Sequence, residues 1–331
     1  MVSSAAKSRG LSRLFAVVIG AALFSLAIGW RPIENGLTVE RHDDLQTKSA
    51  TTDSGSLPPQ SSLATVVLEE DGLIAGIPRR YDQYLREKSR ISNATQIVVE
   101  VGTNLAPDFL RMAKWSSSFF IGLEPIVFEK SKKICRKIPH RCLMLPFAVG
   151  PKNYMAKMNK GFITKCSSLL PLQASDLKAC NRKVETVDVP VITLDSLFEH
   201  VVPQGMQVKM LALDMQGFDL QGASSLRNKE HRDRIANFML ECQDLPVGDK
   251  DFISPGAGSC GEVVDCITKH WGFELDGCWP NQAKAEYNCG FSNPSNPHRD
   301  RTLRPAYNWN ASSHDILYPK PCPAFFTEGT A

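Results

Sequence analysis

The stretch QIVVEVGTN, residues 96–104, decides which fold class the sequence predicts. Its apolar, β-branched run is typical of a buried strand, and the run ends at Glu100 and Gly102. A glycine at this point permits a tight turn and close approach of the backbone to a ligand. A helical pattern with Pro107 in its first turn follows at residues 106–115. A strand, a glycine turn and a helix in succession predict one unit of an α/β sheet with a ligand site at the turn.

The same alternation of strand and helix patterns continues along the chain. Further strands are predicted at residues 118–125, 142–150, 208–214, 234–244, 272–277 and 286–292, and helices at 73–90, 126–138, 218–228 and 260–272. Residues 151–182 are irregular, as in an inserted loop, and are followed by an extended segment and a short helix that Asp195 could cap. Ser259 and Glu262 form the pattern of a capping box. This alternation predicts an α/β fold with a mostly parallel sheet and helices on both faces.

Composition narrows the class of protein. The 331 residues are 43% hydrophobic and 22% charged, with a net charge of +3. These values are ordinary for a globular chain with a substantial core. The small positive charge and the lack of any nucleic-acid-binding motif argue against a nucleic-acid partner.

The first 72 residues predict attachment to a membrane. A basic tail at residues 1–13 precedes the uncharged, apolar run 14–30, which ends in a tryptophan. Its length is at the short end of what spans a bilayer, and the positive flank predicts a single-pass type II orientation. Residues 31–72 are polar and rich in Ser, Thr and Pro, which predicts a flexible stem. The alternative is a cleavable signal peptide with residues 25–27 at its cleavage site.

Both alternatives deliver the remainder to the secretory pathway, either anchored in the Golgi or endoplasmic reticulum or secreted. The ten cysteines and the two N-glycosylation sequons, at Asn93 and Asn310, agree with that address. Without any CxxC pair, the cysteines predict disulfides rather than a metal site. The pairs expected from proximity are Cys135–Cys142, Cys166–Cys180 and Cys278–Cys289, with Cys322 bonded back to the domain.

Acidic residues follow several predicted strands at the point where each strand ends. Glu124 ends the second strand, Asp214 the fourth and Glu241 the fifth. Carboxyl ends of parallel strands meet at one edge of a sheet, and ligands of open α/β sheets bind there. An acid about twenty residues beyond a glycine turn is well placed to accept hydrogen bonds from ribose hydroxyls. Asp214 has a second explanation, because it could cap the helix that starts near Phe218.

The order of these motifs resembles that of the FkbM-type methyltransferase family. The resemblance runs from residue 97 to residue 244 and rests on the motifs EVGTN (100–104), GLEP (122–125), FAVG (147–150), SSL (167–169), VITLDSL (191–197) and LDMQGFD (213–219). It implies a class I methyltransferase fold, which has a seven-stranded Rossmann-like sheet and uses S-adenosylmethionine. On this basis we expect a catalytic domain at residues 73–293 and a Pro/Asn-rich tail at 294–331.

The resemblance also implies roles for individual residues. Glu100, Gly102 and Asn104 match the turn that contacts the amino-acid part of the cofactor. Glu124 matches the acid that holds the ribose hydroxyls, and Ala148 and Val149 match the segment beside the adenine. Asp214 and Glu241 match the acids at the reaction end of the sheet.

Four positions depart from the family pattern. In the cofactor turn, Glu100 replaces an aspartate and Ala106 replaces the last glycine. Around Asp214, Ala212 replaces a lysine and Gln216 replaces a glutamate. Joint loss of a lysine and a glutamate avoids leaving one buried charge uncompensated. It also makes a catalytically inactive relative, kept as a binding or scaffold module, the main alternative to an enzyme.

The function expected from the sequence is methylation of a hydroxyl group on a glycan or related acceptor. Asp214 or Glu241 would accept the hydroxyl proton, while the other orients the acceptor. No metal is expected, although Asp214, Glu241 and Asp244 could share a divalent ion. A nicotinamide-dependent oxidoreductase is disfavoured because the G-x-G-x-x-G turn is missing. Trp271 and Trp279 either stack on a sugar or pack in the core.

Overall fold

A computed structural model describes most of the chain beyond the predicted stem. It covers residues 71–91, 93–115, 117–161, 166–171, 184–245, 256–281, 285–303 and 316–327. The predicted basic tail, the membrane anchor, all but the last two residues of the stem and the Asn310 sequon lie outside the described residues. Among the described residues, the structure contains no helix that is both long and apolar enough to span a membrane.

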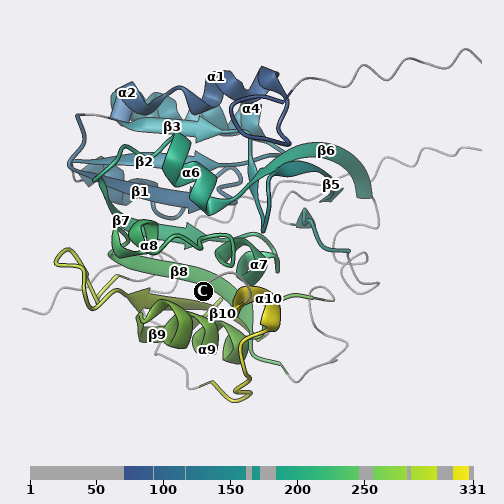
Figure 1. Cartoon of the computed structure of the whole chain (residues 1–331), viewed down its shortest axis with the longest axis vertical. Coiled ribbons are helices and arrows are strands. Elements are labelled where there is room, and N and C mark those ends of the chain that lie inside the picture. Colours follow the sequence, from purple (N-terminus) through teal and green to yellow (C-terminus); the bar gives the residue numbers. More distant parts are fainter. Residues whose placement is uncertain are drawn as a thin grey trace, which may run out of the picture. The chain divides into compact units, whose positions relative to one another are not determined.

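Within the described residues, seven strands form the central sheet (Figure 1). Their order in the sheet is β3 (Cys142–Leu145), β2 (Ser118–Leu123), β1 (Gln96–Val101), β7 (Gln207–Leu213), β8 (Asn237–Gln243), β10 (Glu286–Ser292) and β9 (Glu274–Pro280). The first five strands pair in parallel, and β10 is antiparallel to both of its neighbours. The predicted sheet of seven mostly parallel strands is confirmed.

The strand order shows where a ligand site should lie. The five parallel strands lie side by side as β3-β2-β1-β7-β8. If they are renumbered from one to five by their order in the chain, this is the doubly wound order 3-2-1-4-5, which reverses between β1 and β7. The antiparallel β10 then inserts before the last strand, which completes the seven-stranded sheet. The crevice outside the carboxyl ends of β1 and β7 is therefore the expected site.

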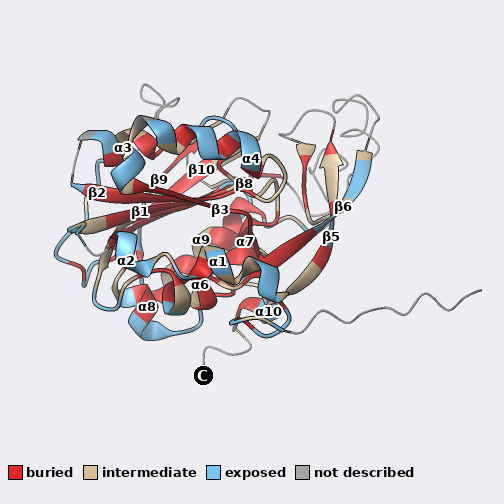
Figure 2. Cartoon of the chain, turned by 90° about the horizontal axis from the view of Figure 1, so that it is seen from above, coloured by how far each residue is buried: buried red, intermediate tan, exposed pale blue. Residues whose placement is uncertain are grey.

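Two apolar layers cover the sheet (Figure 2). Even-numbered residues of β1, such as Val98, face the layer formed by α3 (Leu110–Trp115) and α4 (Phe128–Ser131). Odd-numbered residues, such as Val99, face the larger core beneath α6 (Leu194–His200), α7 (Asp219–Ala223) and α9 (Cys260–Trp271). Burial of both faces explains why the strands are nearly continuous apolar runs rather than alternating ones.

A second, three-stranded sheet corrects two predictions. The stretch predicted as one strand at 142–150 divides into β3 and the short β4 (Ala148–Val149). Within the region predicted to be irregular, β5 (Tyr154–Gly161) pairs antiparallel with β6 (Val184–Ile192), which also pairs with β4. The ion pairs Lys157–Asp188 and Lys160–Glu185 are largely exposed, so side-chain burial at Ala156 and Val189 does more to hold this sheet together.

Four predicted helices are shorter than expected. Those predicted at 126–138 and 218–228 are reduced to α4, which a 3₁₀ helix at Lys132–Lys137 follows, and to α7. Residues 73–90 form η1 (Arg79–Tyr81), α1 (Asp82–Leu85) and α2 (Lys88–Ile91) instead of one helix. Gly76 adopts a left-handed φ of 82° and Pro78 follows, so no helix can run through this point. Helix α3 begins at Leu110, not near Pro107, and the backbone N–H groups of Asp108 and Phe109 just before it donate to Glu100.

Helix capping was predicted correctly at one helix and wrongly at another. The capping box of Ser259 and Glu262 at the start of α9 is confirmed. Helix α6 is capped by Thr193, whose side chain accepts a hydrogen bond from the Ser196 N–H. The predicted cap, Asp195, instead accepts hydrogen bonds from the backbone N–H groups of Arg227 and Asn228. Either residue fits the sequence pattern, and only the tertiary contact separates them.

Disulfides tie the surface segments to the sheet. Cys135–Cys142 and Cys278–Cys289 form as predicted. Cys322 bonds to Cys266 of α9, which confirms that the C-terminal segment is fastened to the domain. A further bridge, Cys242–Cys260, joins the end of β8 to the start of α9. Cys166 is also disulfide-bonded, and its predicted partner Cys180 lies outside the described residues.

The two tryptophans near the closing strands belong to the core. Trp279 is 1% exposed and Trp271 is 9% exposed, and the Trp271 ring packs against Phe238 and Phe326. Rings buried to this extent cannot stack on a sugar. The stacking alternative is therefore wrong.

Candidate functional site

A cleft of about 840 Å³ opens at the carboxyl ends of the parallel strands. Its volume lies within the range of about 300 to 1,000 Å³ that is common for small-molecule sites. All eight residues predicted to bind the cofactor or act in catalysis line it, namely Glu100, Gly102, Asn104, Glu124, Ala148, Val149, Asp214 and Glu241. The two stretches of sequence at residues 100–104 and 213–219 therefore meet in one cavity, at the switch point of the sheet.

Gly102 makes the closest backbone contact in the cleft. It has a left-handed φ of 83°, and a Cβ atom built on it would lie 1.7 Å from the carbonyl oxygen of Asp214. The Asp214 N–H in turn donates to the carbonyl of Val101 at 3.0 Å. No other residue type fits here, because both the backbone conformation and the space exclude a side chain.

Glu100 connects the end of β1 with the start of α3. Its carboxylate oxygens accept hydrogen bonds from the backbone N–H groups of Asp108 and Phe109 at 2.8 and 2.9 Å. The neighbours of Glu100 in the sheet register are Gly122 and Ala212, both of which have small side chains. Burial raises the pKa of Glu100 from 4.5 to about 8, and the two N–H donors oppose that rise.

Glu124 connects the turn after β1 with the turn after β2. Its Oε2 accepts from the Asn104 N–H at 2.8 Å, and its Oε1 accepts from the N–H groups of Ile126 and Val127 at 2.8 and 3.0 Å. Asn104 has a left-handed φ of 47°, which asparagine tolerates better than most residues. The turn at 102–104 is thus fixed by a carboxylate from the neighbouring strand. A carboxylate offers about four lone-pair positions, so Glu124 can still accept from a ligand hydroxyl.

One side of the cleft is apolar. Ala148 and Val149 lie on β4, and Met158 of β5, Leu169 and Phe218 also line the cavity. The second sheet therefore supplies the flat apolar surface that a planar ring system would contact. Thr103, at the base of the first turn, also lines the cleft, and its buried hydroxyl has no hydrogen-bond partner within the described part of the chain.

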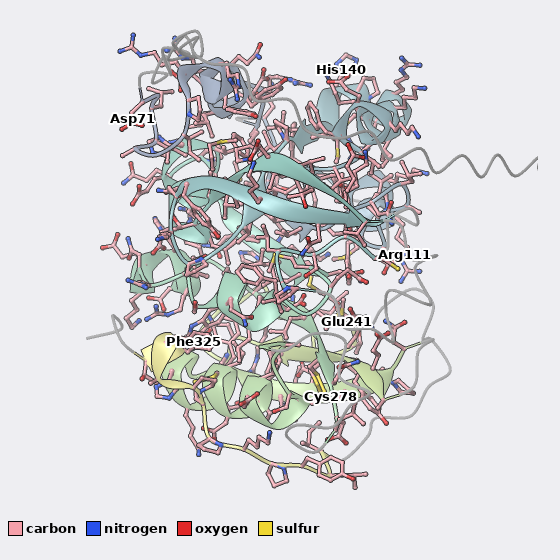
Figure 3. All side chains as sticks on the ribbon, turned by 90° about the vertical axis from the view of Figure 1, so that its right-hand side faces the viewer. Asp71, Arg111, His140, Glu241, Cys278 and Phe325 are labelled. Atoms are coloured by element: carbon pink, nitrogen blue, oxygen red, sulfur yellow. A yellow bond between two sulfur atoms is a disulfide. The ribbon has the colours of Figure 1, made fainter. Side chains whose placement is uncertain are left out.

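The opposite side of the cleft is acidic. Asp214 is exposed at the end of β7, whereas Glu241 on β8 is only 6% exposed. Glu241 is labelled in Figure 3. The amide of Gln216 donates to Oδ1 of Asp214 at 2.8 Å and lies 3.5 Å from Oε2 of Glu241. The amide of Asn281 donates to Oε1 of Glu241. Two side-chain amides thus hold the two predicted catalytic acids.

Helix α7 begins without a side-chain cap, and Asp219 instead holds the turn that precedes it. Its carboxylate accepts from the N–H groups of Met215 and Gly217 at 2.9 and 3.1 Å. Burial and the nearby charge of Asp214 raise the pKa of Asp219 from 3.8 to about 7. The capping explanation for Asp214 is therefore wrong, and its carboxylate faces the cleft.

Asp244 does not complete a metal site. Its carboxylate accepts from the N–H groups of Leu317 and Tyr318 at 3.2 Å, so it fastens the C-terminal segment. Among the residues that the structure describes, one cluster has metal-ligand spacing, formed by Cys242, Cys260 and Cys289. These sulfur atoms are already paired in disulfides. The shared-metal alternative with Asp214, Glu241 and Asp244 is not supported by this arrangement.

Sequence reasoning missed two contributors to the acidic side. Asn281 follows β9, and Glu286 begins β10, so both reach the cleft through the antiparallel end of the sheet. Ser168 belongs to the SSL motif at residues 167–169, but the sequence assigned it no role. In the structure, its hydroxyl donates to the carbonyl of Gln216 at 3.0 Å. No local pattern could have indicated these contacts, because they depend on how distant strands pair.

Comparison with known proteins finds similarity in structure and not in sequence. No family model and no curated protein matches the chain. Among solved structures, mitomycin 7-O-methyltransferase is similar over 65% of this chain, with 11% identity and a TM-score of 0.34. Magnesium protoporphyrin IX methyltransferase from Synechocystis PCC 6803, solved with bound SAH, is similar over 65% of this chain, with 8% identity and a TM-score of 0.34. The similar region covers 55% of the first protein and 82% of the second.

Proposed function

We propose that this protein is an S-adenosylmethionine-dependent methyltransferase that acts on a hydroxyl group. The observation that carries the proposal is the contact of Gly102 with the carbonyl of Asp214, which joins the glycine turn of β1 to the acidic end of β7 in one cleft. A ligand in this cleft would lie against the glycine turn at one end and against Asp214 and Glu241 at the other.

The cleft offers suitable groups for each part of the cofactor. The turn at Gly102 and Asn104, with Glu100 behind it, would hold the amino-acid part. Glu124 would accept from the ribose hydroxyls, and the apolar surface at Ala148 and Val149 would contact the adenine. The described residues lining the cleft include several carboxyl groups and no Lys, Arg or His, which suits a cofactor with cationic groups better than a phosphate-bearing one.

When bound, S-adenosylmethionine supplies a methyl group whose bond to sulfur breaks, leaving the electron pair on sulfur, as the acceptor oxygen bonds to the carbon. The protein's own contribution is to orient the acceptor and to remove the hydroxyl proton. Asp214 and Glu241 would do both, and the contact of Gln216 with both acids supports this role.

The acceptor that suits this site is a glycan or a related polyhydroxylated molecule. The acidic side presents carboxylates and side-chain amides, which accept from and donate to hydroxyl groups. The predicted N-terminal anchor and sequons, together with the disulfides, support a location in the lumen of the Golgi or endoplasmic reticulum. This location follows from the sequence features and not from the cleft.

Glycan masses from cells with and without the protein test the proposal. We expect a species heavier by one CH₂ unit only when the wild-type chain is present, and not with Glu241→Gln. If no glycan or other hydroxyl compound gains this mass while the chain still binds S-adenosylmethionine, the scaffold alternative replaces the enzyme. If the chain binds no S-adenosylmethionine, the proposed cofactor is wrong.

A further inference from the structure

Gln216 lies between the two acids of the cleft and contacts both. Its Nε2 is 2.8 Å from Oδ1 of Asp214 and 3.5 Å from Oε2 of Glu241. A primary amide carries two N–H groups, so one side chain can serve two acceptors. The bridge joins the ends of β7 and β8, which are neighbours in the sheet.

The backbone of Gln216 is held in an unfavourable conformation. Its φ is 53°, in the left-handed region, where a non-glycine residue is destabilised by roughly 1 kcal/mol or more. The Ser168 hydroxyl donates to the carbonyl of Gln216 at 3.0 Å and accepts from the Leu170 N–H at 3.1 Å. Strain that is fixed by surrounding contacts is common at functional sites. Here it directs the amide at the acid pair.

Glu241 accepts on its second oxygen from another amide. The Nδ2 of Asn281 donates to Oε1, while Gln216 faces Oε2. Both carboxylate oxygens of this buried group therefore face N–H donors. Such donors stabilise the charged form of a carboxylate and fix its orientation.

The groups around Glu241 otherwise oppose its ionisation. Burial is the largest cause that raises the pKa of Glu241, followed by the charges of Asp214 on β7, Glu286 on β10 and Asp219 on α7. The hydrogen bond from Asn281 lowers it. The pKa of such a buried carboxyl group responds strongly to each neighbouring donor or charge, because water screens electrostatic interactions less at a buried site.

We propose that Gln216 is a positioning residue that holds Asp214 and Glu241 as one unit, with Glu241 as the group that receives the proton. This inference rests on the proposed methyl transfer and assigns the two acids different tasks. Exposed Asp214 orients the acceptor, and the hydroxyl proton passes to an oxygen of buried Glu241, which becomes neutral. The proton later leaves to water when the product departs.

The substitution Gln216→Glu tests this with a minimal change, because it replaces the NH₂ group by a charged oxygen. The amide donors are lost and a third carboxylate joins the pair. We expect the pKa of Glu241 to rise by about one unit or more, since like charges at this distance produce shifts of that size. Carboxyl ¹³C NMR titration of the full chain labelled at Glu would measure this, with Glu241→Gln identifying the signal.

A matched control is Gln204→Glu. Gln204 is exposed in the turn before β7, and the same chemical change there should leave the pKa of Glu241 unaltered. If Gln216→Glu does not fold, Gln216→Met removes the donors without adding charge and should also raise the pKa. An unchanged pKa of Glu241 in the folded variants would overturn the inference.

A kinetic measurement gives a second readout. The acidic limb of the pH profile of kcat/KM should move upwards by the same amount in Gln216→Glu, which lowers the rate at neutral pH about tenfold per unit. Cofactor affinity should stay close to that of the wild type. A residue that only supported the fold would not move the limb. The NMR titration needs no cofactor, so it can fail or succeed independently of the proposed methyltransferase activity.

Discussion

The two ends of the cleft are built in different ways. At the cofactor turn, the carboxylates of Glu100 and Glu124 bond to backbone N–H groups, and Gly102 packs against a backbone carbonyl. At the acidic end, Asp214 and Glu241 are held by the side-chain amides of Gln216 and Asn281. A hydrogen bond to a backbone N–H survives substitution of the residue that donates it, whereas a bond between two side chains is lost when either one is replaced. The turn should therefore tolerate substitution of the residues that donate to Glu100 and Glu124, while each contact at the acidic end depends on both side chains.

The substitution Gly102→Ala should have the largest effect. It places a Cβ atom against the carbonyl of Asp214 in addition to straining the backbone, so we expect cofactor affinity to fall more than about a hundredfold, with lower stability. Gly205→Ala is the control, because Gly205 has a similar φ of 75° but open space around its Cβ position. That variant should lose only about 1 kcal/mol of unfolding free energy and bind normally. Equal losses in the two variants would show that the contact with Asp214 is unimportant.

The next largest effect is expected at the acidic end. Glu241→Gln keeps the shape of the side chain but removes its basicity, so turnover should fall about a hundredfold or more while cofactor affinity is retained. Steady-state kinetics and calorimetry measure the two quantities separately. Glu230→Gln, at an exposed position of α8 (Lys229–Asp233), is the matched control. Normal turnover in Glu241→Gln would exclude this residue as the base.

A smaller effect is expected at the link between the first two turns. Glu124→Gln loses the negative charge that accepts from the N–H groups of Asn104, Ile126 and Val127. We expect cofactor affinity to fall about tenfold, the effect of losing one charge-assisted hydrogen bond. Glu129→Gln on α4 is exposed and should bind like the wild type. A full loss of binding in Glu124→Gln would indicate that the turn itself had collapsed.

The last prediction concerns the pH dependence of stability rather than binding or turnover. Because burial raises the pKa of Glu100 to about 8, the folded protein keeps a proton here that the unfolded chain loses above pH 4.5. The free energy of unfolding should therefore fall as the pH rises from 4.5 to about 8, with the full contribution present below that window. Glu100→Gln should flatten this dependence in urea titrations at several pH values. A variant with the same slope as the wild type would show that Glu100 is ionised in the folded state.

The cofactor end could be predicted from sequence, because it depends on local order. A buried strand followed by Gly102 and Asn104, and a second strand followed by Glu124, place these residues at one edge of any parallel sheet. Asp214 and Glu241 were found by the same reasoning. Each prediction needed only the direction of its own strand.

The features that the sequence did not predict depend mostly on contacts between distant segments. Asn281 reaches Glu241 only because β10 and β9 close the sheet antiparallel, and Ser168 reaches Gln216 from beside the second sheet. The cap at Thr193 likewise depends on a tertiary contact, because the competing residue Asp195 bonds to a distant segment. The break at Gly76 and Pro78 is instead a local signal that the helical spacing had outweighed. Gln216, a departure from the family pattern in sequence, becomes in the structure the residue that joins the two acids.

Calorimetric titration of the full chain with S-adenosylmethionine tests the central claim most directly. The geometry of the cleft predicts saturable binding of one cofactor molecule per chain, competed by S-adenosylhomocysteine and abolished by Gly102→Ala. No heat of binding, or binding that persists unchanged in Gly102→Ala, would contradict the assignment of this cleft.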